Sequence, residues 1–127
     1  MPSNQISMDE SVGATSGSYR FGRFRIEVDE SGSRLFSDEH PIALSTAEST
    51  ILLVLLQRNG EFVKTEELLK LISSSPMASE NLVHGAVRGL RRTLNDADLI
   101  RNERSKGYSF TAEVDWLKEH SVTYSGT

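Results

Sequence analysis

Cysteine is absent from this chain of 127 residues. Its absence excludes disulfide bonds and thiolate metal sites, and it is compatible with a reducing compartment. Long apolar runs are missing too, since no stretch approaches the roughly 20 apolar residues that a membrane-spanning helix needs. The N-terminus lacks the basic start and the apolar run of a signal peptide. We therefore expect a cytoplasmic protein with no membrane segment in this chain.

The sequence motifs of common enzymes are also missing. The chain holds no Walker-type phosphate loop, no glycine set for a dinucleotide and no Gly-x-Ser-x-Gly sequence. Its three histidines, His40, His84 and His120, do not have the spacing of metal ligands. We expect no enzymatic activity, no catalytic residue, no metal site and no cofactor.

Apolar side chains are scarce at the start of the chain. Residues 1–18 hold only Ile6, Met8 and Val12 as sizeable apolar groups. Such a segment cannot bury enough surface to offset the entropy of ordering it. We expect a disordered tail at 1–18, one folded domain at 19–113, and a C-terminal tail or linker at 114–127 whose Trp116 is able to pack back on the sheet.

A net positive charge is confined to about a quarter of the chain. The net charge is −4, whereas residues 79–108 carry six bases and four acids and are therefore net positive. The six bases are Arg88, Arg91, Arg92, Arg101, Arg104 and Lys106. A basic segment in an acidic chain indicates a surface for an anionic partner.

Alternating apolar residues predict strands near the start of the domain. In residues 19–30, Phe24, Ile26 and Val28 point one way and their charged neighbours the other, which is typical of one half-buried strand. Two shorter strands are expected at 35–36 and 41–44, separated by polar turns. Together they predict a small antiparallel meander.

Two helices are expected after this meander. Ser45 and Glu48 form a capping box at the start of residues 46–58. The run 51–56 is apolar all round, which is typical of a buried core helix; a buried strand is the alternative, disfavoured by the cap and the length. A short helix with acids in its first turn is expected at 65–72.

The third expected helix, residues 79–95, is amphipathic and basic, with Ser79 as its N-cap candidate. At 100° per residue, one face gathers five apolar side chains: Val83, Ala86, Val87, Leu90 and Leu94. The opposite face gathers five polar ones: Asn81, His84, Arg88, Arg91 and Arg92. A turn at 96–98 then leads to a hairpin whose connection contains Gly107, a residue that tolerates a positive φ.

This basic helix and hairpin suit duplex DNA. A helix about 10–12 Å across fits the major groove, and basic side chains near the hairpin tip can reach the adjoining minor groove. The alternative is that the arginines only solvate a helix face near its C-terminus, where the dipole favours cations. Gly85 and Gly89 each cost roughly 1 kcal/mol relative to alanine in a helix. They either allow close approach to DNA or another chain, or are simply tolerated.

Three stretches, 44–72, 81–94 and 99–110, resemble the OmpR/PhoB-type winged-helix DNA-binding domain. The matching positions are Leu44, Glu48, Val83, Val87, Leu90, Arg91, Leu94, Leu99, Ile100, Arg104, Gly107 and Tyr108. The resemblance covers about 19–113. It implies an α+β winged helix-turn-helix with an N-terminal antiparallel sheet, three helices and a C-terminal β-hairpin wing.

The resemblance also implies a bacterial, phosphorelay-related transcription regulator that binds double-stranded DNA. The recognition helix, about 80–95, would enter the major groove and the wing, about 99–110, the minor groove. By position, the helix contacts would come from Asn81, His84, Arg88, Arg91 and Arg92, and the wing contacts from Asn102 and Arg104; Lys106 is added for its charge. Further implied partners are a second copy on DNA and RNA polymerase, through the loop before the recognition helix.

Some features depart from the family pattern. Gly89 stands where a basic residue is common, Ala86 where a larger polar one is, and the loop 73–80 is short. With the net acidity, they leave open a winged-helix protein–protein interaction module that regulates transcription or signalling without binding DNA. Because only 18 residues precede the match, we expect no receiver domain before it. That order is similar to the ToxR/CadC-like regulators, so the chain is either a free-standing regulator or a fragment of an inner-membrane-anchored one.

Overall fold

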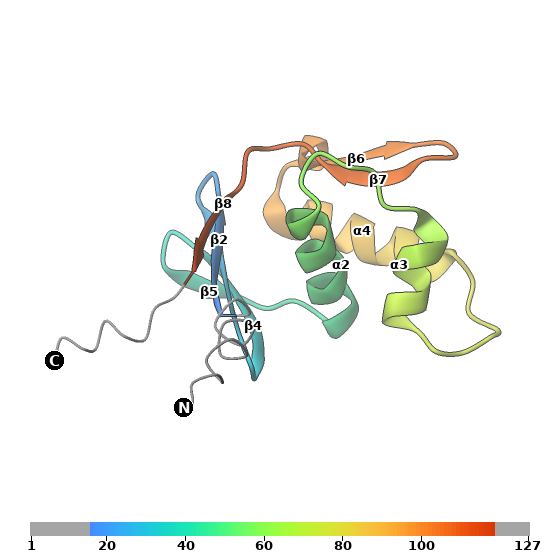
Figure 1. Cartoon of the computed structure of the whole chain (residues 1–127), viewed down its shortest axis with the longest axis horizontal. Helices are drawn as coiled ribbons and strands as arrows, with labels where there is room; N and C mark the ends of the chain where they lie inside the picture. The colour runs from blue at the N-terminus through green and yellow to red at the C-terminus, as the bar shows by residue number, and fades with distance from the viewer. Residues whose placement is uncertain (1–15, 119–127) are drawn as a thin grey trace, which may run out of the picture. The chain divides into compact units, whose positions relative to one another are not determined.

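The computed structural model describes residues 16–118, which form strands, three α-helices and a C-terminal hairpin (Figure 1). The described residues divide into two compact units. We call residues 16–42 with 114–118 the sheet unit, and Ala43–Glu113 the helix-wing unit. Within 16–118, no helix is both long enough and apolar enough to span a bilayer. The expected α+β class with three helices is confirmed.

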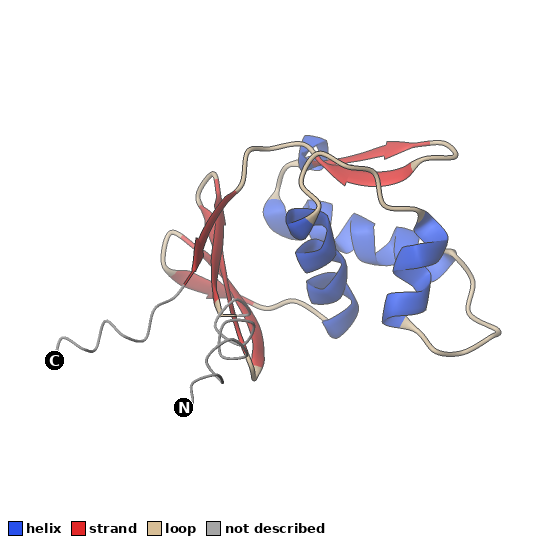
Figure 2. Cartoon of the chain, in the orientation of Figure 1, coloured by secondary structure: helices blue, strands red, loops and turns tan. Residues whose placement is uncertain are grey.

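The sheet unit is a five-stranded antiparallel sheet (Figure 2). Its strand order is β5-β4-β3-β2-β8, with β2 at Gly17–Phe21, β3 at Phe24–Asp29, β4 at Gly32–Ser37, β5 at His40–Ile42 and β8 at Asp115–Lys118. The prediction of one strand over 19–30 is wrong, because the chain reverses at Gly22, whose φ is 60°. Phe21 and Phe24 pair across this turn. The apolar residues lie at 19 and 21 before the turn and at 24, 26 and 28 after it, so the alternation shifts by one residue there, a sign of the reversal that the single-strand prediction did not use.

The sheet extends beyond the expected limits of 19–113 at both ends. Gly17 and Ser18 belong to β2, and β8 pairs with β2, so 115–118 is a strand rather than a tail. The packing of Trp116 on the sheet is confirmed, with its ring centroid 4.5 Å from that of Tyr19. The expected disorder over 1–15 and the expected tail over 119–127 lie outside the described residues.

Helix α2, Thr46–Gln57, is the centre of the helix-wing unit. The capping box is confirmed: the Glu48 N–H donates to Ser45 Oγ at 3.1 Å, and the Ser45 N–H donates to Glu48 Oε1 at 3.0 Å. The buried residues of this helix are Ile51, Leu52, Leu55 and Leu56, whereas residues 53 and 54 are half-buried. The prediction of a helix buried on all sides is therefore wrong for the side that carries residues 53 and 54. Helix α3, Thr65–Ile72, has the predicted bounds.

Helix α4, Asn81–Leu94, buries all five residues of its predicted apolar face. Its start differs from the prediction. Glu80 is the N-cap and makes no side-chain cap bond, while Ser79 Oγ accepts the Asn81 N–H at 3.3 Å from one residue further out. The predicted Ser79 cap is therefore wrong, because the helix begins at Asn81, two residues after the serine.

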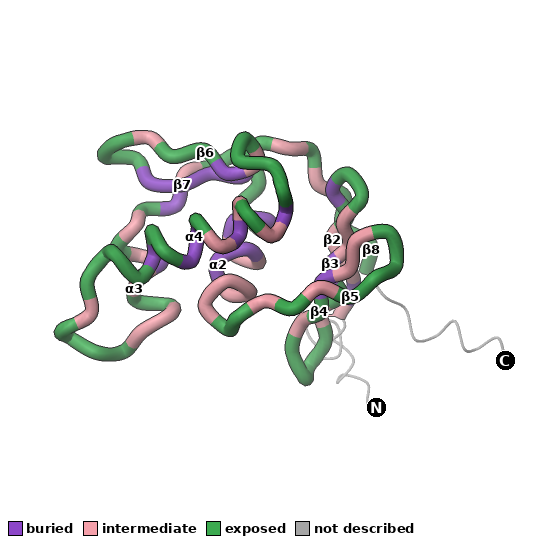
Figure 3. The backbone as a smooth tube through the Cα atoms, turned by 180° about the vertical axis from the view of Figure 1, so that it is seen from behind, coloured by how far each residue is buried: buried purple, intermediate pink, exposed green. Residues whose placement is uncertain are grey.

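The C-terminal hairpin joins β6, Ile100–Glu103, to β7, Gly107–Phe110, after the short 3-10 helix η1, Ala97–Leu99. The predicted positive φ at Gly107 is confirmed, at 105°. On its other side, β7 bridges to Val63: the Val63 N–H donates to the Tyr108 carbonyl at 2.7 Å and the Tyr108 N–H to the Val63 carbonyl at 2.9 Å. This strand is buried along its length (Figure 3), so it anchors the hairpin.

Candidate nucleic-acid interface

The outward side of α4 forms what we call the α4 stripe. Its exposed polar members are Asn81, His84, Arg88 and Arg92, and Gly85 lies among them at helical spacing. Within residues 16–118, the Arg88 and Arg92 side chains form no ion pair. Two guanidinium groups are therefore presented on one helix face without a neutralising acid.

Arg91 does not belong to this stripe, although the helical spacing predicted that it would. Its side chain is half-buried, and its Nη2 donates to the Ile100 carbonyl at 2.6 Å. Its Nε is buried and has no hydrogen-bond partner among the described residues. The prediction that Arg91 points outward with the other polar residues of α4 is therefore wrong. Its side chain links α4 to the start of β6.

The wing, residues 100–110, carries three cations whose surroundings differ. Arg101 pairs with Glu103 at 2.5 Å and lies 6.0 Å from the Phe62 ring centroid. Lys106 lies over the same ring at 5.6 Å. Arg104, in the turn, forms no ion pair or ring contact within the described part of the chain. Among the described residues, Arg104 and Lys106 are therefore the wing cations without an acid partner, and Arg104 has no ring contact either.

The start of α4 and the wing enclose a cleft of about 620 Å³, which we call the α4–wing cleft. It brings together four of the predicted site residues: His84, Asn102, Arg104 and Lys106. Its other walls are Lys64, Thr65, Glu66, Glu80, Glu103, Ser105 and Gly107. Asn102 Nδ2 donates to the Gly107 carbonyl at 3.1 Å, so its amide braces the wing turn.

The two glycines of α4 have different surroundings. A Cβ on Gly89 would lie 2.1 Å from Glu48 Oε2, so this position is small because the capping glutamate of α2 packs against it. A Cβ on Gly85 would have nothing within 4 Å. A Cβ at Gly89 would therefore displace the end of the Glu48 side chain from its cap, whereas a Cβ at Gly85 would displace nothing, so close approach to a ligand is the explanation that Gly85 leaves open.

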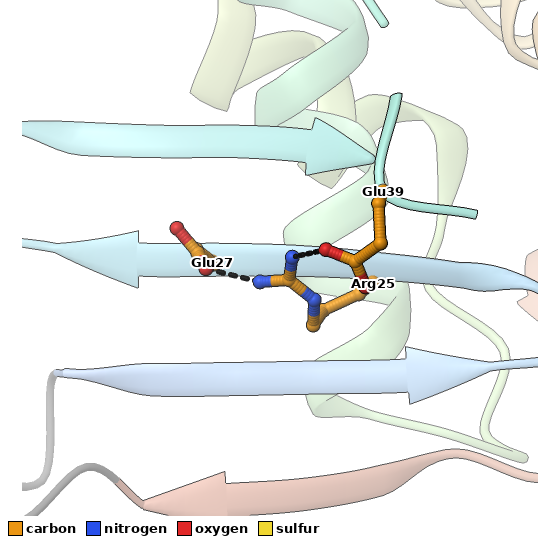
Figure 4. Close-up of polar contacts among 3 residues, drawn as sticks. All are labelled: Arg25, Glu27 and Glu39. Atoms are coloured by element: carbon orange, nitrogen blue, oxygen red, sulfur yellow. Dashed lines mark hydrogen bonds and ion pairs between the residues drawn. The ribbon is translucent and has the colours of Figure 1, made fainter. Parts of the chain in front are cut away.

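The sheet unit contains a contrasting arginine. Arg25 reaches Glu27 and, at 3.0 Å, Glu39, as Figure 4 shows, and its guanidinium lies 4.6 Å from the Phe36 ring centroid. The charge of Arg25 is therefore paired with carboxylates of the same sheet unit.

Among the described residues, no group of three or more His, Asp or Glu side chains is arranged to hold a metal ion.

The roles of two residues of the site were not predicted from the sequence. Phe62 lies under two wing cations, and Tyr108 places its hydroxyl 2.5 Å from His84 Nδ1. The sequence indicates Tyr108 only as part of the Gly-Tyr match to the family pattern. No local pattern joins these residues to the site, because their partners lie 24 or more residues away along the chain.

Comparison with known proteins agrees with this geometry. The family model described as transcriptional regulatory protein, C terminal, matches residues 39–110. The TorCAD operon transcriptional regulatory protein TorR of Escherichia coli is 33% identical over 98 residues, which cover 76% of this chain and 41% of TorR. This chain therefore spans about two fifths of the length of that relative.

Solved structures show the same fold. The response regulator DrrB of Thermotoga maritima, described as an OmpR/PhoB homologue, superposes with a TM-score of 0.65 at 30% identity over 75% of this chain and 44% of that one. The Klebsiella pneumoniae RstA DNA-binding domain, solved with the RstA box, gives 0.60 at 27% identity, covering 74% and 96%. The chain belongs to the family of OmpR/PhoB-type winged-helix DNA-binding domains, the C-terminal domains of transcriptional regulatory proteins.

Proposed function

We propose that this domain binds duplex DNA sequence-specifically to regulate transcription, with α4 in the major groove and the wing in the adjoining minor groove. The observation that carries the proposal is the set of unpaired cations, Arg88 and Arg92 on the α4 stripe and Arg104 on the wing. Cations without acid partners release counterions from DNA phosphates, which supplies much of the affinity. The related RstA domain was solved with its own DNA box.

The residues divide into contacts and supports. Arg88 and Arg92 meet phosphates and base edges, while Asn81 and His84 have the hydrogen-bonding groups to read base edges. Gly85 lets the helix backbone approach the groove closely. In the wing, Arg104 enters the minor groove or meets a phosphate, and Lys106 meets a phosphate. Arg91 and Asn102 act as supports, because each is bound to a backbone carbonyl of the wing.

Fluorescence anisotropy of a labelled AT-rich duplex at about 50 and about 200 mM salt tests the proposal. Phosphate contacts from Arg88, Arg92, Arg104 and Lys106 give a slope of about −3.6 for log affinity against log salt. Binding should therefore weaken by roughly 150-fold between the two salt concentrations. Absence of binding at the lower concentration would contradict the proposal; selection from a random duplex pool then identifies the preferred sequence.

A pair of wing variants tests which cation contacts DNA. Arg104→Ala is expected to flatten the salt slope by about 0.9 and to weaken binding about eightfold near 0.1 M salt, because an unpaired contact is lost. Arg101→Ala is the matched control. Since Arg101 is paired with Glu103 and covers Phe62, its loss should leave the slope unchanged. Equal slopes for wild type and Arg104→Ala would remove Arg104 from the interface.

Exposed apolar side chains support a protein partner as well. Leu71 at the end of α3, Met77 in the following loop and Leu82 at the start of α4 are 51%, 87% and 49% exposed. RNA polymerase is the partner that the family resemblance implies for this loop, and a second copy is the partner it implies on repeated half-sites. Both proposed contacts fit a domain that works in the cytoplasm, where bacterial DNA is transcribed.

The same apolar residues favour the second candidate function, a protein-interaction module that binds no DNA. Backbone amide shifts separate the two. DNA-induced shifts confined to 81–92 and 101–107 support DNA binding. Shifts that appear only with a protein partner, around 71–82, support the second candidate.

A further inference from the structure

His84 and Tyr108 form a polar pair on the wall of the α4–wing cleft. His84 comes from the first turn of α4 and Tyr108 from the middle of β7, and His84 Nδ1 lies 2.5 Å from the Tyr108 hydroxyl. Their rings are 6.1 Å apart between centroids and tilted by 58°. His84 is exposed and lines the cleft, whereas Tyr108 is only 3% exposed. An exposed ring is therefore hydrogen-bonded to a buried one.

The Tyr108 side chain has little freedom to move. Its backbone is paired on both sides, with Asn102 in β6 and with Val63. The hydroxyl position is thus set by a strand that is anchored at both edges. The His84 backbone is held within α4, where its N–H donates to the Glu80 carbonyl at 3.1 Å, and its exposed side chain lines the cleft.

The direction of this hydrogen bond follows from the acidity of the two groups. Burial raises the pKa of the Tyr108 hydroxyl above its ordinary value; the positive charge of Arg91 opposes this rise and the carboxylate of Glu80 adds to it. The hydroxyl therefore holds its proton at neutral pH. A phenol O–H is a good donor, and an unprotonated imidazole nitrogen is a better acceptor than a phenol oxygen.

From this geometry we infer that Tyr108 is a positioning residue: its hydroxyl donates to Nδ1 of His84, holds the imidazole in the Nε2–H form, and so directs an N–H donor into the α4–wing cleft toward an acceptor atom of bound DNA. An imidazole nitrogen that accepts a bond forces the proton onto the other nitrogen. Nε2 has no partner among the described residues, so its N–H is available to a ligand. The DNA part of this inference rests on the proposed function.

Acceptors of two kinds suit this donor, a phosphate oxygen and a base-edge atom such as guanine O6 or N7. The charged groups that line the cleft around His84 are Lys64 and Glu66 at the N-cap and first turn of α3, Glu80 at the N-cap of α4, and Glu103, Arg104 and Lys106 from the wing. These are three cations and three carboxylates, so the cleft lining carries no net charge. The neutral imidazole then adds a directed hydrogen bond without adding charge, so its loss should leave the salt slope unchanged.

The first experiment uses the chain without DNA. Nitrogen-15 spectra at a pH of about 8, above the ordinary histidine pKa, show which ring nitrogen carries the proton. His84→Gln identifies the His84 signals among the three histidines. We expect a protonated Nε2 and an unprotonated, hydrogen-bonded Nδ1. Loss of the hydrogen-bonded Nδ1 signal is expected in Tyr108→Phe. A proton on Nδ1 in the wild-type chain would overturn the inference whether or not the domain binds DNA.

The second experiment is a double-mutant cycle on the labelled AT-rich duplex and on the selected duplex. Tyr108→Phe should weaken binding about threefold to tenfold, the worth of one oriented hydrogen bond. In the His84→Ala background the same change should alter binding less than about twofold. His84→Gln should retain binding within about threefold, because its amide N–H occupies the place of Nε2–H. Equal losses in both backgrounds would show that Tyr108 acts only through stability, and would overturn its positioning role.

The duplexes separate the two acceptors. A phosphate acceptor predicts that His84→Ala weakens every duplex equally, whereas a base-edge acceptor predicts that the loss disappears when one base pair of the selected site is changed. Failure of the wild-type chain to bind either duplex would refute the proposed function together with the DNA role of His84. The nitrogen-15 result would then still decide the tautomer by itself.

Discussion

Replacement of both Arg88 and Arg92 by alanine is expected to weaken binding to the AT-rich duplex by roughly 60-fold at about 0.1 M salt. Each unpaired guanidinium that meets a phosphate contributes about 0.9 to the salt slope, so the slope should fall by about 1.8. Both side chains are exposed and form no ion pair within residues 16–118, so the fold should be unaffected. Anisotropy titrations over a salt series measure both quantities, and a thermal melt confirms the fold.

The sheet unit offers a control with the same change in net charge. Arg20 and Arg23 are exposed there and also form no ion pair among the described residues. The Arg20→Ala, Arg23→Ala variant should keep most of the affinity and the slope, since long-range attraction alone changes. Similar losses in the two double variants would mean that net charge, rather than the α4 stripe, governs binding.

Gly107→Ala is expected to lower the free energy of unfolding by more than about 3 kcal/mol, or the melting temperature by more than about 12 °C. Gly107 has a φ of 105°, and a Cβ there would lie 2.0 Å from the Val63 carbonyl oxygen. Backbone atoms cannot move aside as a side-chain tip can. The variant therefore loses the bridge between Val63 and β7, and the wing with it. Thermal and denaturant melts measure the loss.

Gly60→Ala separates backbone strain from this collision. Gly60 has a φ of 89° in the same helix-wing unit, but a Cβ there would have nothing within 4 Å. It should cost about 1 kcal/mol, from the left-handed backbone alone. Equal stabilities of the two variants would show that β7 can move away from Val63 without cost, which contradicts an anchored wing.

The helices were predictable because their signals are local. The capping box of Ser45 and Glu48, and the five apolar residues of α4, lie within a few turns of one another in sequence. The sheet was less predictable. Strand β8 has four residues and gains its stability from pairing with β2, nearly 100 residues earlier, and no local pattern reports such a partner. The reversal at Gly22 was not predicted because the interpretation followed only Phe24, Ile26 and Val28, whereas the shift from the positions of Tyr19 and Phe21 to that series marks the turn.

The candidate site shows the same division. The sequence predicted where the basic residues fall on the helix and hairpin, but not which of them are already paired. Arg91 and Arg101 have the same charge as Arg88 and Arg104, yet a carbonyl at 2.6 Å holds the first and a carboxylate at 2.5 Å holds the second. Only folding brings those partners close.

By itself the sequence determined the family, the three helices, the apolar face of α4 and the net positive charge of residues 79–108. Those properties depend on residue type and on spacing within one element, and both can be read directly from the sequence. The tertiary structure decided which cations remain unpaired, why Gly89 and Gly107 have no side chain, and that Tyr108 reaches His84. These depend on distances between elements, and such distances are set only when the helices and the wing pack together.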